Sequence, residues 1–381
     1  MNMKRKILFF IPSMMGGGAE RVFSLIINHL DREKFSPILA VVKKEGVFLN
    51  SLPDDIKIIE VEAKLMKFIS HLIHSVFKVK MDVYFSIFTI PKVIKQIKPN
   101  VIFSTLPHLN IVIASVKFFT SKNISYIPRE TSVPSVVNKN VRCAKLFDIL
   151  YRTFYPKFDI IVCPSVHVKN DLMLNFKIPT KKLKVIHNPI DIDYIKKMSD
   201  EHITYFDKKK FNLLAVGRLD YTKGFDFLLK AFAKLKNNTF HLTIIGEGKD
   251  KDMLRNLSKD LKIDDKVSFL GFQQNPYVYM KQADIFILSS RFEGFPNVVL
   301  EANACGTPVI AFDSPGGIKE IITDGVNGIM VKYCDIEDLA LTIERSRGMK
   351  FDKNRIIEII KERFEINKIM KEYEKIFLFQ I

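Results

Sequence analysis

Residues 289–306 read SSRFEGFPNVVLEANACG, and the rest of the chain is interpreted outward from them. The residues just before, 283–288, form the apolar run ADIFIL, which has the length of a buried strand. Pro296 lies where a proline suits the first position of a helix, because the amide hydrogen that it lacks has no helical partner there. The stretch therefore predicts a strand, a loop and a helix, in that order.

Two glutamates in this stretch, Glu293 and Glu301, have seven residues between them. Glu293 lies in the predicted loop, and Glu301 shares a helix face with Asn297, so its side chain points back towards the loop. The helix start adds backbone N–H groups and the positive end of the helix dipole, which favour a phosphate. A diphosphate there would place a ribose diol near Glu301 and a sugar hydroxyl near Glu293. If these two glutamates stood alone, the better interpretation would be that Glu293 only favours the helix dipole and Glu301 is a solvated helix residue.

The segment EGFPNVVLE resembles the E-x7-E signature of retaining glycosyltransferases of family 4. This resemblance implies the fold class: α/β, with two Rossmann-like domains facing a cleft, the glycosyltransferase B-type fold. It covers nearly the whole chain, because companion segments follow in the family's order. The segment GGGAER at 16–21 resembles the first-domain glycine loop of bacterial members that build lipid-linked and cell-surface glycans. The other companions are GRL at 217–219, KG at 223–224 and PGG at 315–317.

Length and composition fit two domains. With 381 residues, of which 47% are hydrophobic, the chain can bury two cores. Strand-like runs alternate with helical patterns in both halves, which predicts parallel sheets covered on both faces. We expect an N-terminal acceptor-binding domain at 1–190 and a C-terminal nucleotide-sugar-binding domain at 191–360. The resemblance adds a final helix at 361–381 that packs back on the first domain.

The cysteines and the apolar runs bear on the compartment. The four cysteines show no C-x-x-C pairing and no short regular spacing, so neither a zinc site nor a disulfide framework is indicated and a reducing cytoplasm fits. The first residues imitate a signal peptide, but Pro12 interrupts the apolar run and GGGAER follows in place of a cleavage site, so we interpret 7–11 as the first strand. No run approaches the roughly 18 apolar residues that span a bilayer, so we expect membrane contact to be peripheral.

Positive charge is concentrated in the first half. The net charge is +17, and residues 1–200 contribute +15 of it, with 31 Lys and Arg against 16 Asp and Glu. This favours an anionic partner. No nucleic-acid-binding motif accompanies the charge, so we expect no nucleic acid and favour an anionic membrane surface, on the cytoplasmic face of the inner or plasma membrane. Residues 64–80, KLMKFISHLIHSVFKVK, have the pattern of a basic amphipathic helix that could lie on that surface or pack on the core.

Two positively charged side chains follow the first strand that is predicted in the second half of the chain. Arg218 follows a predicted strand that ends in Gly217, and Lys223 precedes the next helix, so both lie at the sheet edge where α/β proteins bind ligands. The resemblance implies that they grip the donor diphosphate and stabilise its charge as it leaves, with no metal or other cofactor. Either residue alone would more simply be a surface ion pair. Asp191 and Asp193 form an Asp-x-Asp at the predicted linker, and we reject them as a metal site.

The resemblance assigns further donor-binding residues, which lie in glycine-rich turns and around the helix start. Together with Arg218, Lys223, Glu293 and Glu301, they are Gly17, Gly18, Gly246, Glu247, Phe272, Gly294, Phe295, Pro296 and Asn297.

The expected acceptor-binding residues lie in the first domain: Gly16, His108, Asn110, Arg129 and Glu130. Many family members have a helpful histidine in the loop where this chain has RETS at 129–132. Glu130 is the nearest candidate there for contacting the acceptor hydroxyl, and we count it with Glu293, Arg218 and Lys223 as catalytic. A single histidine such as His108 is more often structural.

We therefore expect a retaining hexosyltransferase that moves a sugar from a nucleotide-sugar, a UDP-sugar, to a lipid-linked or lipopolysaccharide-type glycan. One alternative is a nucleotide-sugar epimerase of similar two-domain fold, although the acid and base set of that family is not evident. A second is a non-catalytic carbohydrate-binding relative, which would be expected to lack Arg218, Lys223 or one of the two glutamates.

Overall fold

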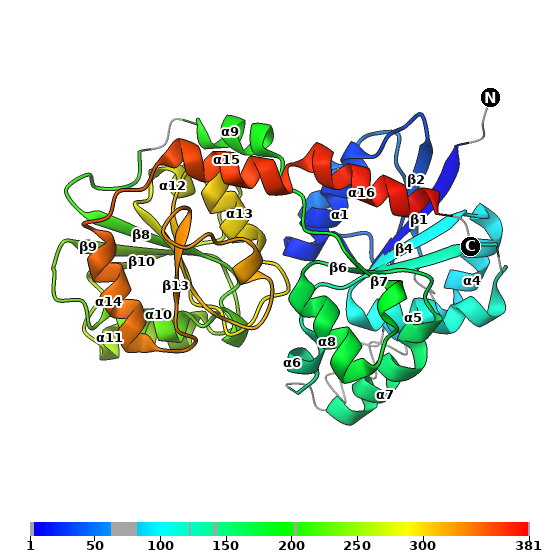
Figure 1. Ribbon diagram of the computed structural model, residues 1–381, viewed down its shortest axis with the longest axis horizontal. Helices are drawn as coiled ribbons and strands as arrows, with labels where there is room; N and C mark the ends of the chain where they lie inside the picture. The colour runs from blue at the N-terminus through cyan, green and yellow to red at the C-terminus, as the bar shows by residue number, and fades with distance from the viewer. Residues whose placement is uncertain (1–3, 62–81, 122, 140–142, 202–203, 380–381) are drawn as a thin grey trace. The chain divides into compact units, whose positions relative to one another are not determined.

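The protein is described by a computed structural model that covers residues 4–61, 82–121, 123–139, 143–201 and 204–379. The chain divides into two α/β units (Figure 1). The first comprises Met1–Pro189 and Ile366–Ile381, and the second comprises Ile190–Glu365. The sequence placed these divisions at 190/191 and 360/361. The segment at 64–80 lies outside the described residues.

Within the described part of the first unit, seven parallel strands form one sheet in the order β3-β2-β1-β4-β5-β6-β7. Parallel strands are covered on both faces, which explains apolar runs such as ILFFI in β1. The order reverses direction between β1 and β4. The strands are β1 (Arg5–Ile11), β2 (Phe35–Val41), β3 (Lys57–Glu60), β4 (Val101–Thr105), β5 (Ser125–Arg129), β6 (Ile161–Cys163) and β7 (Leu183–Val185).

Helices cover both faces of this sheet. Alternate residues of β1 enter different cores, with Phe9 packed among residues of α1 and α16 and Phe10 among residues of α5, α7 and α8. The last helix of the chain, α16, is therefore part of the first unit (Figure 1). Among the residues of this unit that the structure describes, the α-helices are α1 (Gly18–His29), α3 (Asp82–Phe85), α4 (Ile90–Ile97), α5 (Pro107–Val116), α6 (Pro134–Lys139), α7 (Ala144–Phe154), α8 (Val166–Phe176) and α16 (Ile366–Leu378).

The second unit repeats this plan. Its described residues form a six-stranded parallel sheet in the order β10-β9-β8-β11-β12-β13, which reverses direction between β8 and β11. The strands are β8 (Phe211–Val216), β9 (Phe240–Ile245), β10 (Val267–Gly271), β11 (Ile285–Leu288), β12 (Val309–Phe312) and β13 (Gly328–Val331). The helices are α9 (Ile192–Ser199), α10 (Phe225–Phe232), α11 (Lys251–Asp260), α12 (Tyr277–Gln282), α13 (Asn297–Ala304), α14 (Ile336–Ser346) and α15 (Lys353–Phe364).

The α/β class and the two Rossmann-like units are confirmed. The sequence did not predict β13, because its first residue, Gly328, is the last residue of the turn DGVNG and only three strand residues follow it. Among the described residues, no helix is long and apolar enough to cross a membrane.

Candidate active site

The candidate donor site lies in the second unit, where the strand order reverses. β8 and β11 are neighbours in the sheet, but the chain leaves them towards opposite sides. In sheets of this kind, ligands bind outside the carboxyl ends of the two strands at such a point. The loop after β8 carries Arg218 and Lys223, and the loop after β11 carries Glu293. The structure thus brings together the two segments on which the sequence interpretation depended.

Lys223 and Glu293 form an ion pair. The Lys223 Nζ donates to Glu293 Oε1 at 2.6 Å, and the Ser290 Oγ donates to the same oxygen at 2.8 Å. The side chains of Lys223 and Glu293 are only 23% and 12% exposed. A cation and a carboxylate are therefore held, largely out of solvent, at the edge where a ligand would enter.

Arg218 extends into solvent beside this pair of loops. Its Nε donates to Asp220 Oδ2 at 2.5 Å, while its side chain is 73% exposed. Partial burial raises the pKa of Asp220, but hydrogen bonds from Thr222 and the charge of Arg218 outweigh burial and lower the pKa overall. Asp220 therefore remains ionised and orients the guanidinium, which stays accessible to an anion.

Two glycines allow these loops to approach closely. Gly224 has φ +61°, and a Cβ there would lie 2.1 Å from the Ser289 carbonyl oxygen. Gly316 has φ +133°, and a Cβ there would lie 1.5 Å from the Glu293 carbonyl oxygen. The Glu293 amide donates to the Pro315 carbonyl at 3.0 Å, so the PGG segment supports the Glu293 backbone from the other side. The sequence singled out PGG without assigning this role.

The helix after the Glu293 loop differs from the expectation in one detail. α13 begins at Asn297, and Pro296 is the residue that precedes it.

The other residues expected around this helix lie as follows. Gly294 accepts a hydrogen bond from Gly317, and Glu301 lies inside α13 with only 5% of its surface exposed. Phe295 packs into the core with its ring 5.5 Å from that of Phe364, so its side chain faces away from solvent.

The other expected donor residues follow β9 and β10. Gly246 donates its amide to the Gly271 carbonyl at 2.8 Å. The Glu247 carboxylate pairs with Lys251 at 2.7 Å, and its backbone carbonyl accepts from the Leu219 amide at 2.9 Å. Phe272 is 59% exposed. The turn after β9 therefore lies against the segment that carries Arg218, and the turn after β10 lies against the turn after β9.

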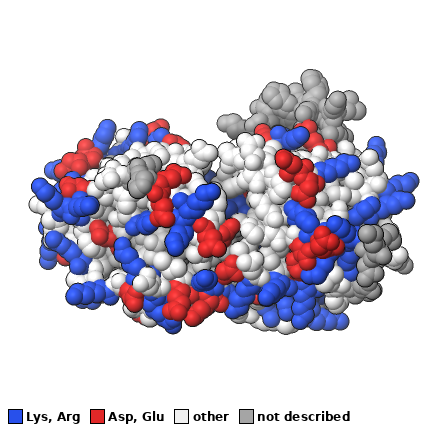
Figure 2. Space-filling model, turned by 90° about the horizontal axis from the view of Figure 1, so that it is seen from above, with Lys and Arg blue, Asp and Glu red and all other residues white. Residues whose placement is uncertain are grey.

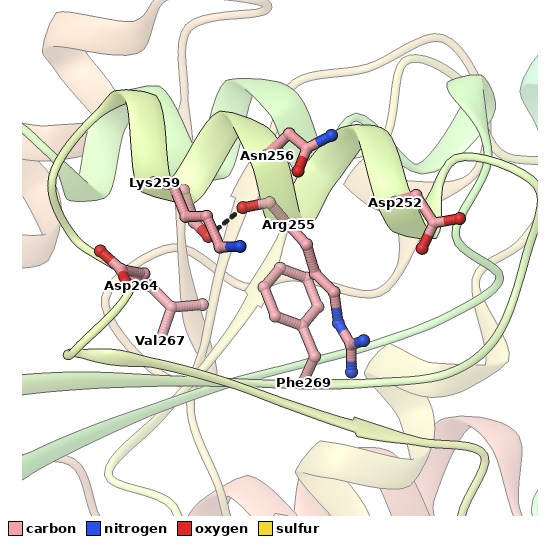
Figure 3. A pocket seen from close by; sticks show the side chains of 8 residues that line it. Asp252, Arg255, Asn256, Lys259, Asp264, Val267 and Phe269 are labelled. Atoms are coloured by element: carbon pink, nitrogen blue, oxygen red, sulfur yellow. Dashed lines mark hydrogen bonds between the residues drawn. The ribbon is translucent and has the colours of Figure 1, made fainter.

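A polar pocket lies between α11 and the edge strand β10 (Figure 3). The Arg255 guanidinium lies 5.9 Å from the centre of the Phe269 ring there. β9 separates β10 from β8 in the sheet, so this pocket is distinct from the Lys223 and Glu293 pair. Its lining residues are Asp252, Arg255, Asn256, Ser258, Lys259, Asp264, Val267 and Phe269.

The glycine turn of the first unit contains the expected acceptor residue Gly16 and the expected donor residues Gly17 and Gly18. Gly16, Gly17 and Gly18 follow β1 and are all exposed to solvent. Gly17 precedes α1 and accepts a hydrogen bond from the Arg21 amide at 3.1 Å. The turn therefore presents backbone, without side chains, at the point where the strand order of the first sheet reverses.

His108 lies at the start of α5, beside the same reversal. Its Nδ1 is 2.6 Å from Tyr84 Oη, and its ring centre is 5.0 Å from that of Phe147. Partial burial lowers the pKa of His108, which favours the neutral imidazole at pH 7, although the residue keeps an exposed surface. Leu106 just before it has φ +74°, a strained conformation for a branched side chain.

The three other acceptor candidates are buried inside the first unit. Asn110 is fully buried, accepts from Ser104 at 2.8 Å and donates to the Arg129 carbonyl at 3.2 Å. The Arg129 guanidinium is hydrogen-bonded to Asn188, and only 2% of the residue is exposed. None of these groups presents a side-chain surface to an acceptor in this structure.

Glu130 is also fully buried and accepts a hydrogen bond from Tyr155. The Tyr151 hydroxyl is 3.5 Å from both carboxylate oxygens. Burial raises the pKa of Glu130 to about 7, despite hydrogen bonds that favour the ionised form. The two tyrosines lie in and after α7, so local sequence gave no sign of this enclosure.

The Asp-x-Asp at the linker has a structural role. Asp191 precedes α9, and its Oδ1 accepts from the Tyr194 amide at 2.9 Å, which caps the helix. Asp193 lies in the first turn of α9, where a negative charge favours the helix dipole.

Two Rossmann-like units, each a parallel sheet covered by helices, are the architecture of the glycosyltransferase B-type fold, and Lys223 and Glu293 pair at the strand reversal of the second unit. Family comparisons agree with this fold. Residues 16–194 match the family described as Glycosyltransferase Family 4, and residues 198–363 match the family described as Glycosyl transferases group 1. The chain belongs to the family 4 glycosyltransferases, and it is an enzyme of that class.

Curated relatives and solved structures agree. The chain is 32% identical, over 86% of each chain, to the Campylobacter jejuni N-acetylgalactosamine-N,N'-diacetylbacillosaminyl-diphospho-undecaprenol 4-alpha-N-acetylgalactosaminyltransferase. It is 28% identical to a second alpha-1,4-N-acetyl-D-galactosaminyltransferase of that organism, over 97% of this chain and 98% of the relative. The structure of Anabaena Alr3699/HepE in complex with UDP-glucose superposes with a TM-score of 0.77 at 19% identity, covering 97% of this chain and 98% of that one.

Proposed function

We propose that this enzyme transfers a sugar, with retention of configuration, from a UDP-sugar to a lipid-linked or lipopolysaccharide-type glycan. The observation that carries the proposal is the Lys223 and Glu293 pair at the strand reversal, with the exposed guanidinium of Arg218 beside it. The Anabaena protein in the comparison holds UDP-glucose, and the Campylobacter relatives are named for undecaprenol-linked acceptors. Both facts support this donor and this acceptor class.

Each donor residue has a chemical task in this proposal. Glycosyl transfer develops negative charge on the departing nucleoside diphosphate and positive charge on the sugar ring. Arg218 and Lys223 stabilise the diphosphate, since fixed cations need no reorganisation as the charge develops. Glu293 binds a sugar hydroxyl, and Glu301 binds the ribose diol. Because the chain supplies the cations, we propose that the reaction needs no metal or other cofactor.

A product assay tests this function. We expect a UDP-sugar, supplied in a panel of nucleotide sugars with membrane extract, to give an extended lipid-linked or lipopolysaccharide glycan that mass spectrometry detects. The new linkage should have the anomeric configuration of the donor, and activity should persist in EDTA. An inverted linkage would contradict retention, and failure of every donor would contradict the function. Loss of activity in EDTA, with rescue by Mn²⁺ or Mg²⁺, would contradict the metal-independent reaction and would make Asp191 and Asp193 the first candidates for a metal site.

We also propose that the first unit docks on the anionic cytoplasmic face of the inner or plasma membrane. Residues 1–200 carry +15 of the net charge. On the face drawn in Figure 2, Lys and Arg side chains are interspersed with Asp and Glu side chains rather than gathered in one patch. Apolar surface is also available, since Phe118 is 63% exposed and Phe119 is 79% exposed, and the Lys157 ammonium lies 5.7 Å from the Phe118 ring centre. An enzyme on this surface would meet a lipid-bound acceptor at high local concentration.

Vesicle co-sedimentation tests this docking. Each basic residue near an anionic leaflet contributes about 1 kcal/mol, and the attraction decays within a Debye length, so we expect binding to weaken at high salt. An apolar contribution to binding would remain at high salt, because it is insensitive to salt. Binding should therefore fall further when Phe68 and Leu72 in the segment at 64–80 are changed to Ser. Neutral vesicles are the control. Docking is ruled out if the wild type does not co-sediment with anionic vesicles at low salt.

A further inference from the structure

We infer that Arg291 is a positioning residue that ties the segment with Lys223 to the segment with Glu293, so that their side chains meet before a donor binds. The catalytic consequence rests on the proposed function, but the tie itself is a property of the second unit alone. Arg291 lies two residues before Glu293 in the loop after β11, and neither the E-x7-E spacing nor the strand pattern assigned it a role.

The first part of the tie is made to backbone. Three successive carbonyls, those of the short 3-10 helix Tyr221–Lys223, accept hydrogen bonds from the loop after β11. Arg291 Nη1 donates to the Tyr221 carbonyl at 2.7 Å, and the Arg291 amide donates to the Thr222 carbonyl at 2.8 Å. The Ser289 hydroxyl donates to the Lys223 carbonyl at 3.1 Å. Every residue of the 3-10 helix is thus held by this loop.

The second part is made by the planar guanidinium. Arg291 donates from Nη1 and Nη2 to the two carboxylate oxygens of Asp226, both at 2.8 Å. Its carbon Cζ lies 4.0 Å from the Tyr221 ring centre and 4.3 Å from the Phe227 ring centre. Asp226 and Phe227 belong to α10, which directly follows Gly224. Arg291 therefore contacts the chain on both sides of Lys223.

The ion pair between Arg291 and Asp226 is largely buried, and its geometry favours arginine over lysine. The side chains of Arg291 and Asp226 are 13% and 21% exposed. Burial lowers the pKa of Arg291, but the hydrogen bonds and charge of Asp226 outweigh it and raise the pKa overall. A lysine would keep the charge but lose the paired donors and the flat surface that the rings contact.

A third segment supports the same residue. The Tyr333 hydroxyl, in the loop after β13, donates to the Arg291 carbonyl at 2.9 Å. The amide, carbonyl and guanidinium of Arg291 are therefore all engaged. A surface ion pair would engage only its side chain.

Hydrogen exchange of the ligand-free protein tests the tie without requiring activity. We expect Arg291→Ala to speed amide exchange by at least about tenfold in peptides covering both 220–224 and 289–293, with a smaller effect for Arg291→Lys. Arg355→Ala is a matched control, because it removes an arginine of α15 that pairs with Glu358 at 2.6 Å in the same unit. Unchanged exchange at 220–224 in Arg291→Ala would overturn the inference.

Kinetics test whether Arg291 acts through Lys223. In the wild-type background we expect Arg291→Lys to lower kcat about tenfold while the donor KM changes less than about threefold. In a Lys223→Ala background the same change should cost less than about twofold, because the group to be positioned is already missing. An equal loss of kcat in both backgrounds would contradict positioning through Lys223.

The two tests separate this inference from the proposed function. If exchange does not respond to Arg291→Ala while the wild type transfers sugar, the tie is wrong and the function stands. If the wild type transfers no sugar but exchange rises at both segments, the tie stands and the function is wrong.

Discussion

Lys223→Ala should lower kcat by at least about a hundredfold while the protein remains folded. The Lys223 ammonium lies 2.6 Å from Glu293 Oε1 at the strand reversal, so it is fixed before a diphosphate arrives. The diphosphate carries more negative charge in the transition state than in the bound donor, and removing a fixed cation should therefore affect kcat more than donor binding. Steady-state kinetics with the donor identified in the product assay measure this effect.

Arg218→Ala should give a loss of at least about a hundredfold for the same electrostatic reason. Lys234→Ala is the matched control, since Lys234 also forms an ion pair, with Glu337 at 2.5 Å in the same unit, but follows the C-terminal end of α10, whereas Lys223 precedes its N-terminal end. Circular dichroism of each variant shows whether the fold is retained. Wild-type turnover in the Arg218 and Lys223 double variant would end the assignment of both residues to the diphosphate.

The architecture could be predicted from the sequence because each buried parallel strand is a short apolar run between polar turns. The run ADIFIL at 283–288, for example, predicted a strand, and the structure has Ile285–Leu288. The juxtaposition of Lys223 and Glu293 could also be predicted, since residues just after neighbouring parallel strands meet at one sheet edge. Both predictions use only local pattern and one general property of the fold.

Long-range contacts set the limit of that reasoning. Arg291 contacts Tyr221 and Asp226, which lie 70 and 65 residues earlier. Arg129 is bonded to Asn188, which lies 59 residues later. Partners so distant along the chain leave no local pattern in the sequence. The residues that contact Arg291 and Arg129 could therefore not be predicted from the sequence.

Glu130 shows the same limit with larger consequences. Its position after β5 was predicted, but the tyrosines that enclose its carboxyl were not, and Tyr155 lies 25 residues away. A carboxyl in contact with solvent suits an acceptor hydroxyl. A fully buried carboxyl instead links protonation to folding.

We expect Glu130 to destabilise the first unit progressively as the pH rises from about 4.5 to about 7. Burial raises its pKa from 4.5 to about 7 in the folded state. Between these values the folded state holds a proton that the unfolded state has released, so stability is fully present at low pH and is lost as the pH rises through the folded pKa. The total loss is about 3 kcal/mol, and it levels off above the folded pKa.

Glu130→Gln should remove this dependence, because an amide stays neutral throughout. Chemical denaturation at a series of pH values, followed by circular dichroism, measures the stability of the variant relative to the wild type, and this difference should grow in favour of the variant between pH 4.5 and 7. Glu358→Gln is the matched control, because the Glu358 side chain in α15 is 58% exposed, and no such growth is expected. Transfer assays at the same pH values distinguish this stability effect from the acceptor role that the sequence suggested. The acceptor role predicts a large fall in kcat for Glu130→Gln. Parallel stability curves for the variant and the wild type would show that the buried carboxyl does not titrate in this range, and that its enclosure by Tyr151 and Tyr155 does not govern its pKa.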